Sequence, residues 1–175
     1  MYETIAIVQL GPTLDYPVEK LRDKVAQKFP GYQVRLLEPV ETPPMAFDSF
    51  RKQYHSTRIL AELEENVEAA RTECVLGVFA SDLFAPGMNF VFGEARCPGR
   101  VAVISTYRLS ANADDLLESR VVKEAVHEIG HMLGLQHCSH PSCVMYFSER
   151  LADTDRKRDG FCAECGPKMK WLEIE

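Results

Sequence analysis

Short continuous apolar runs alternate along the chain with longer stretches in which apolar residues lie three or four positions apart. The runs at residues 4–10, 74–80 and 101–106 predict strands that are buried on both faces. The periodic stretches at residues 15–29 and 49–71 predict amphipathic helices. Strands that alternate with helices in this way predict an α/β fold, with a mixed and mostly parallel twisted sheet and flanking helices.

Two weaker patterns predict further strands. Residues 32–37 alternate weakly between apolar and polar side chains, and residues 89–94 form a short apolar segment after Pro86 and Gly87. The second segment is typical of an edge strand, which can bind an extended peptide by adding it to the sheet. Its candidate substrate-binding residues are Phe90, Val91, Phe92 and Gly93.

The pattern changes near the end of the chain. From about residue 135 cysteine, histidine, proline and glycine become frequent and the hydrophobic periodicity fades. We expect one compact domain over residues 1–175, in which residues 1–134 form the sheet and helices, including the helix that carries the candidate chemistry. Residues 135–175 are expected to form an irregular subdomain that depends on a metal ion for its shape.

Composition and charge exclude several classes of protein. Of the 175 residues 46% are hydrophobic and 26% are charged, which is typical of a globular domain. The formal net charge is −6 and the basic residues form no stripe, so we expect no nucleic-acid partner. No apolar run approaches the roughly 20 residues of a membrane helix, and residues 1–8 lack the pattern of a signal peptide. We therefore expect a cytoplasmic monomer with no membrane partner.

The helix that carries the candidate chemistry is predicted to begin at Asn112, which can serve as its N-cap. At 100° per residue, one side of this helix collects apolar side chains, those of Val122, Val126, Ile129 and Leu133. The opposite side collects ionisable side chains, those of Glu124, His127, Glu128 and His131. Two histidines at positions i and i+4 can bind one metal ion, and the glutamate between them then lies beside that ion.

Gly134 is predicted to end this helix, because glycine adopts the positive φ of a sharp C-terminal reversal without steric cost. The reversal can bring His137 back to the same ion as a third ligand. Three histidine nitrogens leave a fourth position for water, which is typical of a catalytic zinc site. Glu128 could then take a proton from that water and pass it to a leaving amine. Cobalt, nickel or copper would also accept three histidines.

The string His127-Glu128-x-x-His131-x-x-Gly134-x-x-His137 resembles the signature of the metzincins, in which a later methionine forms a turn beneath the zinc ligands. Met145 follows His137 by eight residues and fits that position. Within the metzincins, the chain looks most like archaemetzincin, through the spacing of Cys138, Cys143, Met145, Cys162 and Cys165 and through residues 89–95. The interval from Met145 to Cys162 is one residue shorter than in that family. The resemblance implies a zinc-dependent peptidase.

Four of the six cysteines form two pairs that predict a second metal site. Cys138 and Cys143 are followed, after 18 residues, by Cys162 and Cys165. This spacing is typical of a structural zinc held by four thiolates, and thiols in a reducing compartment more often bind metal than form disulfides. Two disulfides, four free thiols, or His140 in place of one cysteine remain alternatives. Because Cys138 directly follows His137, a structural zinc would brace the turn that places the third histidine.

The hypothesis is a zinc metallopeptidase that contains two zinc ions per chain, one catalytic and one structural, and cleaves peptide or protein substrates. The alternative is a non-catalytic or autoinhibited zinc-binding protein, in which the apolar and acidic residues 171–175 could cover the cleft. A zinc hydrolase with a different substrate is a third option. Glu128 favours catalysis, since a structural site has no use for this carboxylate.

Overall fold

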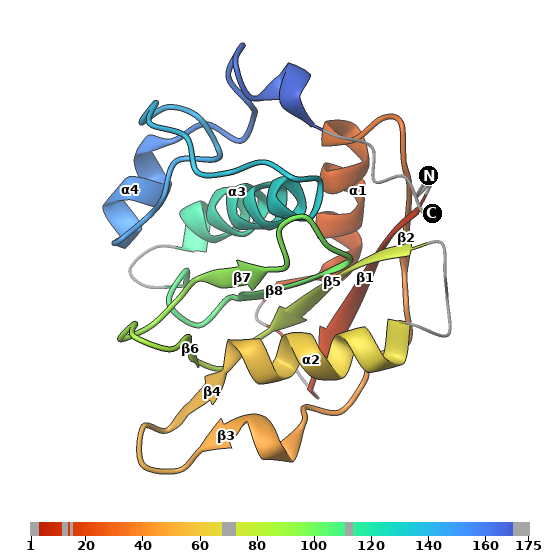
Figure 1. Ribbon diagram of the computed structural model, residues 1–175, viewed down its shortest axis with the longest axis vertical. Coiled ribbons are helices and arrows are strands. Elements are labelled where there is room, and N and C mark those ends of the chain that lie inside the picture. Colours follow the sequence, from red (N-terminus) through yellow and green to blue (C-terminus); the bar gives the residue numbers. More distant parts are fainter. Residues whose placement is uncertain (1–3, 12–13, 15, 68–72, 111–113, 170–175) are drawn as a thin grey trace.

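A five-stranded, mostly parallel sheet forms the centre of the fold (Figure 1). The computed structural model describes residues 4–11, 14, 16–67, 73–110 and 114–169. The strands lie in the order β2-β1-β5-β8-β7, and only β7 runs antiparallel to its neighbour. Their bounds are Thr4–Leu10 for β1, Gln33–Leu36 for β2, Glu73–Phe79 for β5, Gly93–Ala95 for β7 and Val101–Ser105 for β8. The predicted α/β fold with a mixed, mostly parallel sheet is confirmed.

Helices cover both faces of this sheet, as Figure 1 shows. Helices α1 (Val18–Lys28) and α3 (Asp114–Met132) lie on one face, and α2 (Ser56–Val67) lies on the other. Successive residues of a strand point to opposite faces, so Ile5 packs with α1 and α3 while Ala6 packs with α2. The continuous apolar runs in the sequence follow from this two-sided burial.

The predicted helix over residues 49–71 is wrong for its first seven positions. Residues 49–55 belong to a hairpin of β3 (Phe47–Asp48) and β4 (Gln53–His55), and α2 begins only at Ser56. The Asp48 carboxylate accepts the backbone N–H groups of Phe50 and Arg51, which turns the chain locally. Side chain to backbone bonds of this kind compete with helix formation, and the apolar spacing does not reveal them.

The predicted edge strand at residues 89–94 is shorter than expected. Strand β7 starts only at Gly93 and occupies the end of the sheet beside β8. Val91 instead makes an isolated antiparallel bridge with Leu83 of β6 (Leu83–Phe84), which pairs with the β3–β4 hairpin in a second small sheet. The candidate substrate segment therefore passes from the small sheet to the central one.

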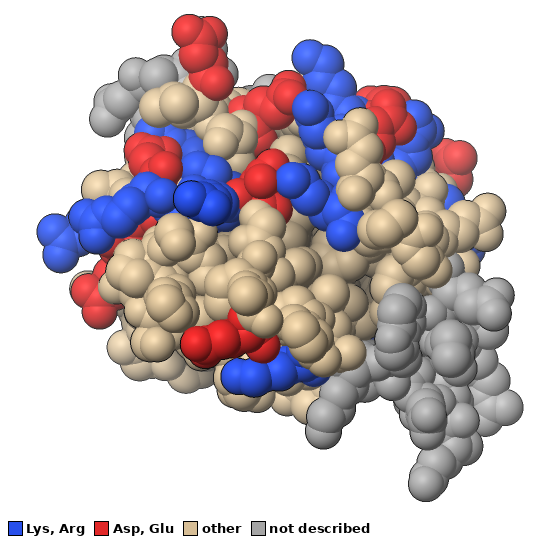
Figure 2. Space-filling view, turned by 90° about the horizontal axis from the view of Figure 1, so that it is seen from above, with Lys and Arg blue, Asp and Glu red and all other residues tan. Residues whose placement is uncertain are grey.

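The C-terminal part of the chain lies against the outer side of α3 (Figure 1). It contains one short helix that the sequence pattern did not predict, α4 (Leu151–Arg156), and 3-10 turns occur at Pro44–Ala46 and Gly166–Lys168. Figure 2 shows basic and acidic side chains interspersed across the upper half of the face seen from above, with mostly uncharged residues below them. Among the described helices, none has the length and apolar character to cross a membrane. The N-cap predicted at Asn112 lies outside the described residues.

Candidate metal centres

Both sides of helix α3 are buried where it carries the histidines. The apolar side packs in the core with the sheet, as its spacing predicts, through Val122, Val126, Ile129 and Leu133. The ionisable side is also covered: Glu124, His127 and Glu128 are each at most 4% exposed, and His131 is half-buried. Charged and ring groups placed in this way require specific partners, because burial without a partner is costly.

A Schellman motif ends α3 at Gly134, which has a φ of 90°. The amide of Gly134 donates to the carbonyl of His131, and the amide of Leu135 donates to that of Gly130. The chain then reverses and brings the His137 ring to 4.7 Å from the His131 ring, measured between centroids. The reversal expected from the glycine is thus present, and it places the third imidazole beside the first two.

The three imidazoles present their Nε2 atoms to one another. His131 Nε2 lies 3.1 Å from His127 Nε2 and 3.2 Å from His137 Nε2. In His127 and His131, Nδ1 lies 2.7 Å from a backbone carbonyl, that of Val144 and that of Leu135 respectively. A carbonyl only accepts, so these Nδ1 atoms carry the proton and each Nε2 holds a lone pair. Nitrogen lone pairs that converge in this way can be shared by one cation.

The spacing of the nitrogens fits zinc. A tetrahedral ion with Zn–N bonds of about 2.0 Å separates two ligand nitrogens by about 3.3 Å, close to the 3.1 and 3.2 Å found here. Burial lowers the pKa of His131 to about 4 and also lowers the pKa values of His127 and His137. The rings are therefore neutral near pH 7, which is the form that binds a metal ion.

Glu128 lies beside the histidines in a cleft of about 560 Å³. Its Oε2 atom is buried and has no hydrogen-bond partner in the described part of the chain. Burial, with the nearby Glu124 carboxylate as a second cause, raises the pKa of Glu128 well above its ordinary value. A carboxylate with a raised pKa can both accept and release a proton near neutral pH.

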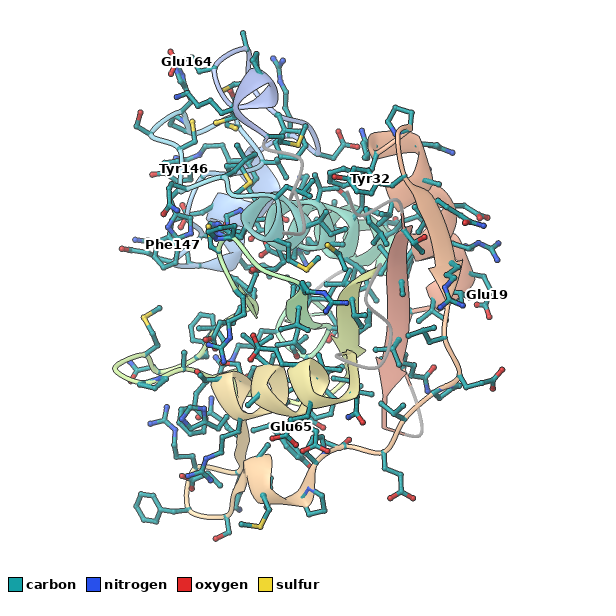
Figure 3. The ribbon with its side chains drawn as sticks, turned by 45° about the vertical axis from the view of Figure 1, so that its right-hand side comes forward. Glu19, Tyr32, Glu65, Tyr146, Phe147 and Glu164 are labelled. Carbon is teal, nitrogen blue, oxygen red and sulfur yellow. The ribbon has the colours of Figure 1, made fainter. Side chains whose placement is uncertain are left out.

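The cleft is bounded by segments from three parts of the chain. One wall is the predicted substrate segment, in which Phe90, Val91, Phe92 and Gly93 all line the cleft. Another wall is formed by residues 147–149, which follow Met145 and Tyr146. Figure 3 shows Tyr146 and Phe147 on the same side of the molecule. The Phe147 ring packs against His137 with centroids 5.0 Å apart.

Met145 lies fully buried beneath the active-site helix. A Cβ atom built on Gly130 would lie 2.5 Å from Met145 Sδ, so the missing side chain of Gly130 provides the space for the sulfur. The preceding residue, Val144, supplies the carbonyl that accepts from His127. This segment therefore orients one imidazole and packs under the helix that carries two of them.

Four cysteines converge at a second centre. The Sγ atoms of Cys138, Cys143, Cys162 and Cys165 all lie within 4.8 Å of one another, and none of these residues forms a disulfide. Cys138 Sγ and Cys162 Sγ are 3.8 Å apart. Tetrahedral zinc with Zn–S bonds of about 2.3 Å separates two sulfurs by about 3.8 Å. Neither His140 nor a disulfide is part of this arrangement.

Backbone amides surround the cysteine sulfurs. The amide of His140 donates to Cys138 Sγ at 3.4 Å, and the amide of Cys162 donates to Cys143 Sγ at 3.4 Å. The backbone amide of Cys165 lowers the pKa of Cys162 to about 6. Amide donors favour the thiolate form, which is the form that binds zinc.

The two centres share backbone contacts. Cys138 directly follows His137, and its amide donates to the carbonyl of Met145 at 2.9 Å. Cys143 directly precedes Val144, whose carbonyl orients His127. The backbone thus connects the cysteine centre to the histidine centre at two places. One is His137, through its neighbour Cys138, and the other is His127, through Cys143 and Val144.

Two further residues near the cleft have specific partners. Glu124 forms a buried ion pair with Lys157, 2.9 Å away. Cys97 lines the cleft and accepts a hydrogen bond from Gln136 at 3.2 Å. Cys74 packs in the core away from the cleft, and burial raises its pKa to about 12.

Comparison with known proteins agrees with this geometry. A family profile described as peptidase family M54 matches residues 12–171. The archaemetzincin of Archaeoglobus fulgidus is 43% identical over 156 residues, which cover 89% of this chain and 92% of the relative. The archaemetzincin of Methanopyrus kandleri is 40% identical over 154 residues, which cover 88% of this chain and 86% of the relative.

Solved structures show the same likeness. The crystal structure of the Archaeoglobus fulgidus archaemetzincin with malonate has a TM-score of 0.83 at 41% identity, and covers 94% of this chain and 99% of that one. The structure of the Methanopyrus kandleri archaemetzincin has a TM-score of 0.85 at 36% identity, and covers 94% of this chain and 91% of that one. The chain belongs to peptidase family M54, together with the archaemetzincins, and is a zinc-dependent metallopeptidase.

Proposed function

We propose that this chain hydrolyses peptide bonds at the histidine centre, with His127, His131 and His137 as zinc ligands and Glu128 as the residue that transfers protons. One observation carries the proposal. Imidazole Nε2 atoms 3.1 and 3.2 Å apart converge beside a buried carboxylate whose second oxygen has no partner among the described residues. A purely structural metal site gains nothing from that carboxylate.

The donor set fits a catalytic zinc. Three neutral imidazoles fill three positions of a tetrahedron and leave the fourth open to the cleft. Zinc at such a site supplies Lewis acidity, which polarises a peptide carbonyl and acidifies a water molecule. The carbonyls of Val144 and Leu135 hold two of the rings in the required tautomer and orientation.

Glu128 performs the proton transfers in this proposal. Glu128 lines the cleft, and its buried Oε2 atom has no hydrogen-bond partner among the described residues, so the carboxylate can accept a proton from the attacking water. The raised pKa then allows the carboxyl group to deliver that proton to the nitrogen of the leaving amine. Burial favours the neutral carboxyl between these two steps.

The substrate is an extended peptide. Strand β7 is the last strand of the central sheet, so one of its edges is available for main-chain hydrogen bonds from a peptide. Phe90, Val91 and Phe92 continue the same wall of the cleft before the strand begins. Peptide addition at this wall would bring a scissile bond alongside Glu128.

The cysteine centre is proposed to hold a second, structural zinc. Four sulfur ligands close the tetrahedron, which leaves no position for water. The ion would organise a segment with little apolar periodicity of its own, so its binding energy contributes to folding. Four thiols bind zinc only while they are reduced, which favours a reducing compartment such as the cytoplasm.

The experiment compares wild type with Glu128→Gln on a diverse peptide library, with zinc content measured for both proteins. Glu118→Gln, on the exposed part of the same helix near Lys20 and Lys24, is the matched control. We expect Glu128→Gln to retain zinc and to lose at least 100-fold in cleavage rate, while the control cleaves like wild type. Equal cleavage by wild type and Glu128→Gln would contradict the proposed role, and no cleavage by any variant would favour the non-catalytic alternative.

A further inference from the structure

An ion pair between Glu124 and Lys157 is buried beside the histidine centre. Lys157 Nζ lies 2.9 Å from Glu124 Oε1, and the two side chains are 0% and 4% exposed. Glu124 belongs to α3, three residues before His127, and it lines the cleft. Lys157 directly follows α4. Burial of two charges is costly, so a pair in this position calls for a role beyond stability.

The pair connects the cleft wall to the active-site helix. Lys157 Nζ also donates to the carbonyl of Tyr146 at 3.4 Å, and the hydroxyl of Thr154 donates to Glu124 Oε1 at 3.3 Å. Tyr146 directly precedes the cleft wall of residues 147–149, of which Phe147 packs against His137. One ammonium group therefore contacts both the helix that carries the histidines and the residue that leads into the wall.

The pair also sets the charge next to the metal centre. The Lys157 ammonium contacts Glu124, which lines the cleft together with the three histidines, and the carbonyl of Tyr146, which directly follows Met145. Its positive charge therefore lies beside the histidine centre. This positive charge would repel a divalent cation bound by the histidine rings. The Glu124 carboxylate offsets the positive charge, because the carboxylate lies against the ammonium in a region of low dielectric constant.

Charged contacts continue along the same interface, one turn farther from the histidines. The guanidinium of Arg120 forms two hydrogen bonds with the Asp155 carboxylate, at 2.7 and 2.8 Å. Lys123 Nζ donates to the carbonyls of Thr154 and Asp155 near the end of α4. These contacts also join α3 to α4, so the interface offers a control pair, Arg120 and Asp155, that does not line the cleft.

We propose that Glu124 and Lys157 are a positioning pair for the histidine centre. Their ion pair holds Tyr146, and with it the wall at residues 147–149, against α3, and the Glu124 carboxylate offsets the ammonium charge so that the centre can hold a divalent cation. This inference rests on the proposed function only in that the three histidines bind zinc. Neither residue is proposed to contact the substrate.

The test is the zinc affinity of the histidine centre, measured by competition with a chelator in Glu124→Gln and Lys157→Met. Removal of the carboxylate leaves the ammonium charge beside the ion, so Glu124→Gln should weaken zinc binding by about tenfold or more. Removal of the ammonium leaves a carboxylate, so Lys157→Met should bind zinc at least as tightly as wild type. Both variants should melt at a temperature lower by roughly 10 °C, because each leaves a buried charge without its partner.

Two further variants separate charge from packing. Glu124→Asp keeps the carboxylate and should keep wild-type zinc affinity even where its melting temperature falls. Asp155→Asn breaks the neighbouring pair with Arg120 and should lower the melting temperature without changing zinc affinity. Should Glu124→Gln fail to fold, Glu124→Asp and Lys157→Met decide the question, since the proposal requires both to retain zinc.

Equal losses of zinc affinity in Lys157→Met, Glu124→Gln and Asp155→Asn would overturn the proposal, because they would mean that zinc binding merely follows stability. Unchanged affinity in a folded Glu124→Gln would overturn it as well. No substrate enters the measurement, so a chain that binds zinc but cleaves no peptide would contradict the proposed function while leaving this inference standing.

Discussion

Gly130 and Met145 meet so closely that the helix has no room for a side chain at position 130. A Cβ atom there would lie 2.5 Å from Met145 Sδ and 3.1 Å from the Phe161 ring. Glycine in the middle of a helix is less stable than alanine by about 1 kcal/mol. Packing of the methionine under the histidine-bearing turn of α3 therefore outweighs helix propensity at this position.

Gly130→Ala should destabilise the protein by about 1–3 kcal/mol, although helix propensity alone favours alanine by about 1 kcal/mol. The added methyl group displaces Met145, and with it the carbonyl of Val144 that orients His127. Urea unfolding measures the stability change. Zinc affinity at the histidine centre should fall in the same variant.

The double variant Gly130→Ala/Met145→Ala tests whether the sulfur is the cause. If it is, removal of the methionine side chain should reduce the cost of the alanine at position 130, so the two changes should be less than additive. A Gly130→Ala protein more stable than wild type would show that the close contact does not constrain the helix.

A second glycine makes room for Glu128. A Cβ atom on Gly93 would lie 2.7 Å from Glu128 Oε1 and 2.8 Å from the carbonyl of Val103. Gly93→Ala should therefore displace the carboxylate and reduce peptide cleavage by at least tenfold, since a shift of about 1 Å can cost 100-fold. Zinc content, measured alongside cleavage, should stay at the wild-type value.

Gly160→Ala is the matched control for that substitution. Nothing lies within 4 Å of a Cβ atom at position 160, so the same chemical change should leave cleavage unaltered. If Gly93→Ala cleaved peptides as fast as wild type, the glycine would have no part in placing Glu128.

The fold was predictable because its strands are buried on both faces and its helices have clear apolar stripes. The continuous apolar runs that end at Leu10 and Phe79 are too short for a typical helix, so their length predicts strands. The β3–β4 hairpin was not predictable, because its turn depends on the Asp48 carboxylate rather than on apolar spacing. Helix α4 was missed because charged contacts with α3, such as that of Asp155 with Arg120, hold it in place.

The histidines and cysteines could be predicted as two groups because their spacing is constrained by a helix turn and by short loops. Lys157 could not be predicted, since a lysine in a polar stretch of sequence gives no sign that it is fully buried. Its partner Glu124 lies on the predicted ligand side of the helix, but the sequence does not show which cation reaches it. Ion pairs between residues far apart in the chain produce no periodic pattern in the sequence.

Cys143→Ser should weaken zinc binding at both centres. It removes one thiolate from the cysteine centre and loosens Val144, the residue that follows it and orients His127. Loss of such an orienting contact typically lowers metal affinity by about tenfold or more. Native mass spectrometry of the variant should show reduced occupancy at both centres.

Cys97→Ser is the control for the loss of a thiol, because Cys97 belongs to neither cysteine pair. It should retain both ions. Full occupancy of the histidine centre in a Cys143→Ser protein that had lost the other ion would contradict the coupling between the centres.

Thiol reactivity checks the placement of the remaining cysteines. Burial raises the pKa of Cys74 to about 12, so at pH 8.5 the thiol stays protonated and shielded from reagents. Brief treatment of the zinc-loaded protein with iodoacetamide should modify Cys97, which is exposed, and leave Cys74 unmodified. Peptide mapping measures both. Rapid alkylation of Cys74 in the folded protein would contradict its burial in β5.

Anomalous diffraction at the zinc absorption edge tests the central claim, that this chain holds one zinc among the imidazoles and another among the thiolates. Crystals grown with zinc should give two anomalous peaks per chain. One peak should lie between the Nε2 atoms of His127, His131 and His137, and the other between the four cysteine sulfurs. A map with density at the cysteines and none at the histidines would contradict the account.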